Sequence, residues 1–298
     1  MKRIEFGVLP VDLKIETASF KIELAEEYLE VVKKFRLQSN PDGYFYPPIL
    51  ATYEGTWDGP GKKVDYSERE ATVFRVPGSH ILSILHPENW PENEIPLIAD
   101  LIVYYLGFVF GYRCQTSDRW LDGRTNTKAF SDHSAPNNTW IKKSLGIVNN
   151  LWERLDDRRK GVLLNALFLH NRASGYRWDW ERFMIEYQVT DALYRIANKA
   201  HNVVARRHAD RIQAMCDKYD VWYTRELIDN VVDLRNDLLH EALWDGNIPT
   251  SSSHRGVVAP GLLHSLNERL FFGILGYKGN YLQSKWSARV LHLFDLKY

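Results

Sequence analysis

The spacing of apolar residues changes partway along this chain of 298 residues. The N-terminal part contains short extended-looking segments, namely RIEFGVL, LKIETASFKIEL, ILATYEG and ATVFRV, separated by turn-forming pieces such as SNPDGY. From about residue 140 onward, apolar residues recur at the spacing of amphipathic helices. This change predicts an α+β protein with two regions of different character.

We therefore expect a mixed strand and helix domain over residues 1–135 and an α-helical bundle domain over residues 140–298. Residues 20–36 fit a strand or a helix, because ELAEEYLEVVKKF has helical spacing with acidic residues early and lysines late. Residues 95–112 predict a buried helix. The N-terminal domain carries no motif with known chemistry, and we expect a sensing or regulatory role for it only because it accompanies the second domain.

Four helical stretches are predicted in the second domain. They cover residues 140–173 as one or two helices, 179–215 as one long helix, 224–243, and a final helix that begins near Pro260. Proline favours the first turn of a helix, where its missing N–H costs nothing.

Composition excludes several classes of protein. The 38 basic and 38 acidic side chains cancel, so a nucleic-acid surface requires local clustering of positive charge. The two cysteines, Cys114 and Cys216, lack the spacing of a disulfide framework or a zinc site. The start MKRIEFGVLPVDLKIE does not resemble a signal peptide, and the apolar run 101–112 is too short to span a bilayer. We expect a soluble cytoplasmic protein without membrane contact.

Common catalytic motifs are also missing from the sequence. It contains no P-loop, no GxGxxG after a strand, no HExxH and no GxSxG. His133, His170 and His254 have no second ligand at a supporting spacing, so we interpret them as ordinary loop or helix-end histidines. No metal and no cofactor are expected.

Residues 227–243, placed on a helical wheel, put one arginine among apolar residues. Arg235 falls inside the apolar arc, whereas Asp233, Asn236 and His240 lie together on the polar side, with Asn236 and His240 as neighbours four residues apart. The arc consists of Leu227, Ile228, Val231, Val232, Leu234, Leu238, Leu239 and Leu243.

The helix over residues 180–204 has the complementary feature, because Glu186 lies in the middle of its apolar arc. An unpaired charge that faces a core costs several kcal/mol. We therefore expect Glu186 and Arg235 to meet between the two helices. A buried structural ion pair, or an arginine whose head reaches water, would satisfy the same pattern.

The string RNDLLH, which begins at Arg235 and ends at His240, resembles the signature of the HEPN superfamily (higher eukaryotes and prokaryotes nucleotide-binding). In that signature an Arg, often followed by a polar residue such as Asn, precedes a His by four to six intervening residues. The preceding ERFMIEYQVTDALYRI is similar to the acidic first helix of HEPN proteins of the ApeA type. The resemblance covers about residues 145–280 and implies metal-independent RNA cleavage with two copies joined across a homodimer.

Carried over to this chain, the resemblance makes Arg235 and His240 the catalytic pair, with Asn236, and further out Glu186 and Asp233, in support. Imidazole suits proton transfer at neutral pH, and guanidinium matches two phosphate oxygens. The basic residues expected to hold RNA along the long helix are Arg195, Lys199, Arg206, Arg207 and Arg211.

Such an RNase suits a toxin or phage-defence effector, with an antitoxin or regulatory partner. The alternatives are a silent HEPN domain that binds nucleotide, RNA or protein, and a dimerisation module.

Overall fold

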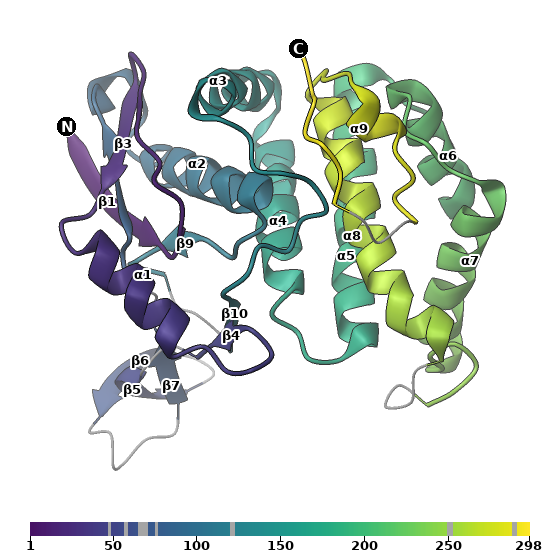
Figure 1. Ribbon diagram of the computed structural model, residues 1–298, viewed down its shortest axis with the longest axis horizontal. Coiled ribbons are helices and arrows are strands. Elements are labelled where there is room, and N and C mark those ends of the chain that lie inside the picture. The colour runs from purple at the N-terminus through teal and green to yellow at the C-terminus, as the bar shows by residue number, and fades with distance from the viewer. Residues whose placement is uncertain are drawn as a thin grey trace. The chain divides into compact units, whose positions relative to one another are not determined.

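The computed structural model describes residues 1–46, 49–56, 59–64, 71–74, 77–119, 123–248, 253–287 and 291–298 (Figure 1). They form two compact units. The first comprises Met1–Gly107 and Gly111–Ala129, and the second comprises Phe108–Phe110 and Phe130–Tyr298. Among the described residues every strand belongs to the first unit, while helices occur in both, so the protein is α+β.

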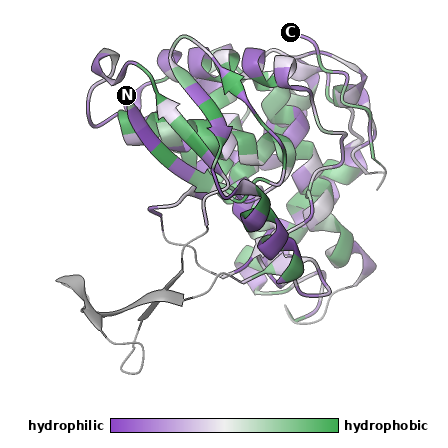
Figure 2. Cartoon of the chain, turned by 60° about the vertical axis from the view of Figure 1, so that its left-hand side comes forward, coloured by the Kyte–Doolittle hydropathy of each residue, from purple (hydrophilic) through white to green (hydrophobic). Residues whose placement is uncertain are grey.

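A five-stranded antiparallel sheet organises the first unit, in the order β2-β3-β8-β1-β9. Charged and apolar residues alternate from Arg3 to Phe6 in β1, which starts beside the label N in Figure 2, because successive side chains of a strand point to opposite faces. The five strands are β1 (Lys2–Gly7), β2 (Ile15–Glu16), β3 (Phe20–Leu24), β8 (His80–Ile84) and β9 (Gln115–Thr116).

The segment with two interpretations contains both kinds of structure: β3 ends at Leu24, and α1 (Tyr28–Leu37) follows. Helix α1 places Val31, Val32 and Phe35 in a small core with Val8 and Phe45. The other elements that begin in this unit are β4 (Tyr44–Phe45) paired with β10 (Thr125–Asn126), the sheet of β6 (Gly59–Val64), β5 (Ile49–Thr56) and β7 (Ala71–Phe74), the short η2 (Pro87–Asn89) and α2 (Ile95–Phe110).

The second unit is helical. Helices α4, α5 and α8 pack side by side, and α6 and α7 pack against each other (Figure 1). The elements are α3 (Asn138–Arg154), α4 (Asp157–Ala173), α5 (Asp179–His201), α6 (His208–Tyr219), α7 (Arg225–Asn236), a π-helical turn η3 (Asp237–Glu241), α8 (His254–Ile274) and α9 (Asn280–Gln283). Side-chain caps start several of them, since Asn137, Asp156, Thr224 and Ser253 each accept a hydrogen bond from a backbone N–H of the first turn.

Two expectations about these helices are wrong. The stretch 179–215 is two helices, because Asn202 adopts a left-handed conformation with φ of 56° and ends α5. The Tyr194 hydroxyl bonds both N and O of Ala205 and so fixes the connection. Helix α8 begins at His254, ahead of Pro260, and the short α9 follows it.

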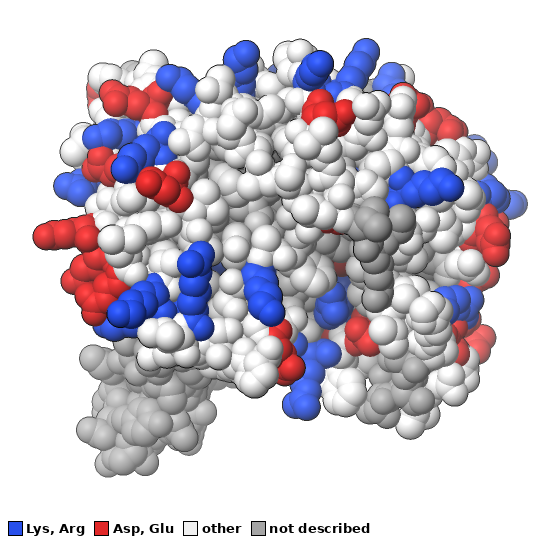
Figure 3. Space-filling model, in the orientation of Figure 1, with Lys and Arg blue, Asp and Glu red and all other residues white. Residues whose placement is uncertain are grey.

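Charged residues of both signs are interspersed on the face that Figure 3 shows. Among the described residues, no helix combines the length and the apolar character that crossing a bilayer requires. Cys114 and Cys216 are buried free thiols.

Candidate functional site

The motif that begins at Arg235 spans the point where α7 changes into the π-helical turn η3. In an α-helix, residues five apart point about 140° away from each other. In a π-helix the hydrogen bonds run from residue i to i+5, so residues five apart lie close in direction. The turn ends at Ala242, which has φ of 56°. This local geometry brings Arg235 and His240 to the same side of the segment.

Arg235 contacts both of the other predicted catalytic residues. Its Nη1 donates to Asn236 Oδ1 at 2.9 Å and, over a longer 3.4 Å, to His240 Nε2. Because a guanidinium only donates, this contact leaves Nε2 of His240 as an acceptor without a proton. The imidazole is therefore oriented by Arg235, whereas the helical wheel paired it with Asn236.

The π turn also changes which residues of this segment are buried. Ile228, Val231 and Leu234 are buried as expected, but no residue of η3 is, and Leu239 is 48% exposed. The wheel placed Leu239 in the core because it assumed the α-helical angle throughout. Arg235 is half-buried and His240 is exposed.

Helices α5 and α6 supply further polar groups around Arg235. Its guanidinium lies 5.9 Å from the centre of the Tyr187 ring, and the same ring lies 5.8 Å from the ring of His208. Asp191 Oδ1 lies 3.5 Å from His208 Nδ1 and 4.0 Å from Arg211 Nη1. We call Tyr187, Asp191, His208, Arg211 and Arg235 the α5–α7 cluster.

Burial and charge act on the titrating groups of this cluster. Burial lowers the pKa of His208, and the positive charges of Arg235 and Arg211 lower it further against the opposing effect of Asp191. Burial also raises the pKa of the Tyr187 hydroxyl, which stays protonated. The imidazole of His208 is therefore neutral at pH 7.

The other four basic residues predicted to hold RNA are not part of this cluster. Arg195 and Lys199 are exposed on α5, where Lys199 interacts electrostatically with Asp156. Arg206 and Arg207 follow the break and line a surface hollow with Asp210 and Asp217. Of the five residues, only Arg211 belongs to the α5–α7 cluster.

The expected pair between Glu186 and Arg235 is contradicted. Glu186 is fully buried, and its carboxylate accepts hydrogen bonds from His170 Nδ1 at 3.0 Å, His264 Nδ1 at 2.7 Å and Asn267 Nδ2 at 2.8 Å. These three donors satisfy the charge, so no arginine is required. Among the described residues, neither Glu186 nor the exposed Asp233 bonds to Arg235 or His240.

His170, Glu186 and His264 offer ligand atoms within 4.8 Å of one another, a separation that raises the question of a metal. His264 donates from Nδ1 to Glu186 and from Nε2 to the carbonyl of Phe130 at 2.6 Å, which leaves no lone pair for an ion. Burial lowers the pKa of His264, but Glu186 overcomes this and raises it overall. The rings of His170 and His264 stack at 3.9 Å and 8°, so no single point lies in both ring planes. The geometry fits a buried ion pair better than a metal centre.

Sequence reasoning treated His170 as an ordinary helix-end residue and missed this network. Its members come from α4, α5 and α8, and Glu186 and His264 are separated by 78 positions. The apolar position of Glu186 was the one signal, because a buried carboxylate requires buried donors.

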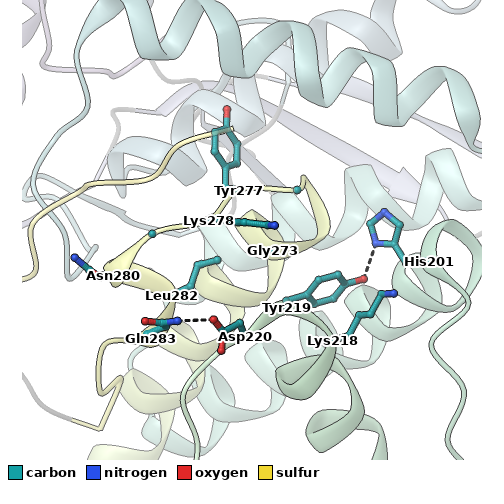
Figure 4. Close-up of a pocket in the computed structure, with 12 residues that line it drawn as sticks. His201, Lys218, Tyr219, Asp220, Gly273, Tyr277, Lys278, Asn280, Leu282 and Gln283 are labelled. Carbon is teal, nitrogen blue, oxygen red and sulfur yellow. Dashed lines mark hydrogen bonds between the residues drawn. The ribbon is translucent and has the colours of Figure 1, made fainter.

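A pocket of about 620 Å³ lies at the C-terminal end of α6, at the opposite end of that helix from His208 (Figure 4). His201 and Tyr219 point toward each other there, joined by a hydrogen bond of 2.8 Å, and Asp220 bonds to Gln283. Lys218 and Lys278 also line it. The pocket is separate from the α5–α7 cluster.

Comparison with known proteins adds no relative. No family model matches the chain, and neither curated proteins nor solved structures gave a match.

Proposed function

We propose that this protein is a metal-independent endoribonuclease of the HEPN type, with Arg235 and His240 as its catalytic pair. The observation that supports this most is the 3.4 Å contact between Arg235 Nη1 and His240 Nε2, made possible by the π turn. It holds a permanent cation and an unprotonated ring nitrogen side by side. These are the two groups that transphosphorylation of RNA requires.

In the proposed reaction the ribose 2′-hydroxyl gives up its proton and its oxygen attacks the adjacent phosphorus. The bond from phosphorus to the 5′ oxygen breaks and that oxygen takes up a proton, and His240 is the proton-transfer group of the pair. Arg235 exchanges its contact with His240 for the phosphate oxygens, and its two-pronged donor pattern stabilises the charge of the phosphorane. Asn236 supports Arg235 through its Oδ1. The products are a 2′,3′-cyclic phosphate and a 5′-hydroxyl, and DNA is resistant because it lacks the attacking group.

We further propose that the protein acts as a homodimer. Leu239, directly beside His240, leaves a large apolar side chain 48% exposed, which favours coverage of this surface by a second copy. An RNase of this kind suits a toxin or antiviral defence role in the cytoplasm, restrained by an antitoxin or another regulatory partner.

The test is incubation of the purified protein with RNA in EDTA, with analysis of the cleaved ends. We expect the wild type to produce cyclic phosphate ends, and Arg235→Ala and His240→Ala to lose at least about 100-fold in rate. Arg225→Ala is the matched control, because Arg225 lies at the other end of α7 and is exposed. Cleavage that persists in both site variants excludes the assigned site, while RNA binding without cleavage by any form indicates a silent binding domain.

A further inference from the structure

Four polar atoms of the α5–α7 cluster are buried and have no hydrogen-bond partner. They are Tyr187 Oη, His208 Nδ1, Arg211 Nε and Arg235 Nε. Buried polar atoms in folded proteins are nearly always satisfied, so a group of them in one place indicates a ligand or ordered water. These four come from α5, α6 and α7 and interact electrostatically with one another.

The charge of this group favours an anion. Asp191 is the one carboxylate of the α5–α7 cluster, and it faces both His208 and Arg211, while Arg235 adds a second guanidinium. His208 and Arg211 lie in the first turn of α6, whose N-terminus has no side-chain cap. A helix N-terminus, two guanidinium groups and a tyrosine hydroxyl together match a phosphate.

We propose that His208 is the second proton-transfer group of the site, so that one chain supplies both the base and the acid. This inference rests on the proposed ribonuclease function. The resemblance to HEPN proteins implied two copies of the motif joined across a homodimer. Here His208 and Arg235 lie against the same tyrosine ring, and Arg235 contacts His240.

His208 Nε2 accepts the proton of the 2′-hydroxyl while the 2′ oxygen forms its bond to phosphorus. The bond between phosphorus and the 5′ oxygen breaks. His240, which takes up a proton from water at Nε2 once Arg235 has left it for the phosphate, gives that proton to the oxygen. Arg211 and Arg235 stabilise the charge on the remaining phosphate oxygens. His208 then gives its extra proton to water.

The environment of His208 suits the role of base. Asp191 faces Nδ1 from α5 and favours the tautomer with its proton there, which leaves Nε2 as the acceptor. Tyr187 packs beside the ring from α5, and Arg211 on α6 and Arg235 on α7 are the cations that act on it. Burial and these two cations lower its pKa, so the ring is neutral at pH 7. The side chain is still 30% exposed and within reach of a substrate.

The experiment measures single-turnover cleavage of a labelled mixed-sequence RNA in EDTA across pH 5 to 9, for the wild type, His208→Asn and His240→Ala. Asparagine keeps polarity at position 208 but transfers no proton. In the wild type we expect the cleavage rate to increase with pH on the acidic side, where the base loses its proton, and to decrease on the alkaline side, where the acid loses its proton. His208→Asn should cleave about 100-fold more slowly or worse and should lose the acidic limb of this profile. His240→Ala should lose the alkaline limb. Affinity for a non-cleavable 2′-O-methyl version of the RNA should change by less than about tenfold in both.

His201→Ala is the matched control, because His201 is also half-buried, lies on α5 and bonds to Tyr219 away from the cluster. A His208→Asn protein that keeps the wild-type rate and both limbs of the pH profile overturns the role of His208 and leaves the ribonuclease proposal intact. A lower melting temperature and lower RNA affinity with an unchanged profile assign His208 a structural role and also overturn it. If the wild type cleaves none of the RNA, both proposals fail together.

Discussion

Arg235 belongs both to the α5–α7 cluster and to the motif RNDLLH. Its Nη1 bonds to Asn236 and His240, while its Nε is buried without a partner and its charge lies over Tyr187. A guanidinium can do this because its donors point in several fixed directions in one plane. A single ammonium group cannot reproduce that arrangement.

Arg235→Lys should therefore impair cleavage although the positive charge is kept. We expect the rate to fall by at least about tenfold, because lysine cannot bridge two phosphate oxygens and orient His240 at once. The affinity for the 2′-O-methyl RNA should fall less, since the long-range attraction remains. Single-turnover kinetics and fluorescence anisotropy measure the two quantities. Full activity of the lysine variant would show that charge alone is required.

At the same scale, the signature that RNDLLH resembles grouped Arg235, Asn236 and His240, whereas the helical wheel placed Arg235 apart from the other two. The sequence could not identify the partners of Glu186, because His170 and His264 lie 16 and 78 positions away. Local spacing carries information about contacts within a few turns, whereas long-range partners depend on how the helices pack.

Two features set the geometry of the α5–α7 cluster. One is the π turn η3, and the other is the contact of α8 with α6, the helix that carries His208. Helix α8 comes close to α6 at Gly273, where an added Cβ would lie 2.5 Å from Tyr219 Cβ and 2.8 Å from Tyr219 Cγ. No larger residue fits between these helices without displacing α6.

Gly273→Ala should therefore destabilise the protein by about 1 to 3 kcal/mol through overpacking. Gly261→Ala is the matched control in the same helix, because nothing lies within 4 Å of its added Cβ. That variant should gain about 0.5 to 1 kcal/mol, since alanine favours the helix. Urea unfolding measures the free energy of unfolding of both variants. If Gly273→Ala and Gly261→Ala changed it in the same direction, this description of the contact between α6 and α8 would be wrong.

At the scale of the whole molecule, the stability of the second unit depends on buried carboxyl groups. Glu268 is fully buried, and Tyr281 donates a hydrogen bond to its Oε2 at 2.9 Å. Burial raises the pKa of Glu268 to about 8, against the opposing charges of His264 and Arg269. In the unfolded chain a glutamate titrates near pH 4.3. Between these values the folded protein holds a proton that the unfolded chain has lost.

The free energy of unfolding should therefore fall as the pH rises from about 4.3 to about 8, with a slope of at most about 1.4 kcal/mol per pH unit from this group. Glu268→Gln removes that slope, because an amide resembles the protonated acid and does not titrate. Relative to the wild type, the variant should gain stability between pH 5 and pH 8 in urea unfolding. The exposed Glu226→Gln serves as the control. If the free energy of unfolding of Glu268→Gln differed from that of the wild type by the same amount at every pH in this range, Glu268 would be ionised in the folded protein.

The sequence by itself determined the α+β class and most of the helices, because the period of apolar residues is written within each segment. It also grouped Arg235 with His240. Tertiary structure alone decided that the chain turns back at Asn202 to bring His208 and Arg211 to this site, and that Glu186 pairs with two histidines. Neither result is encoded in spacing, because a buried charge is stabilised by whichever donors the packing brings to it, however far apart they lie in the chain.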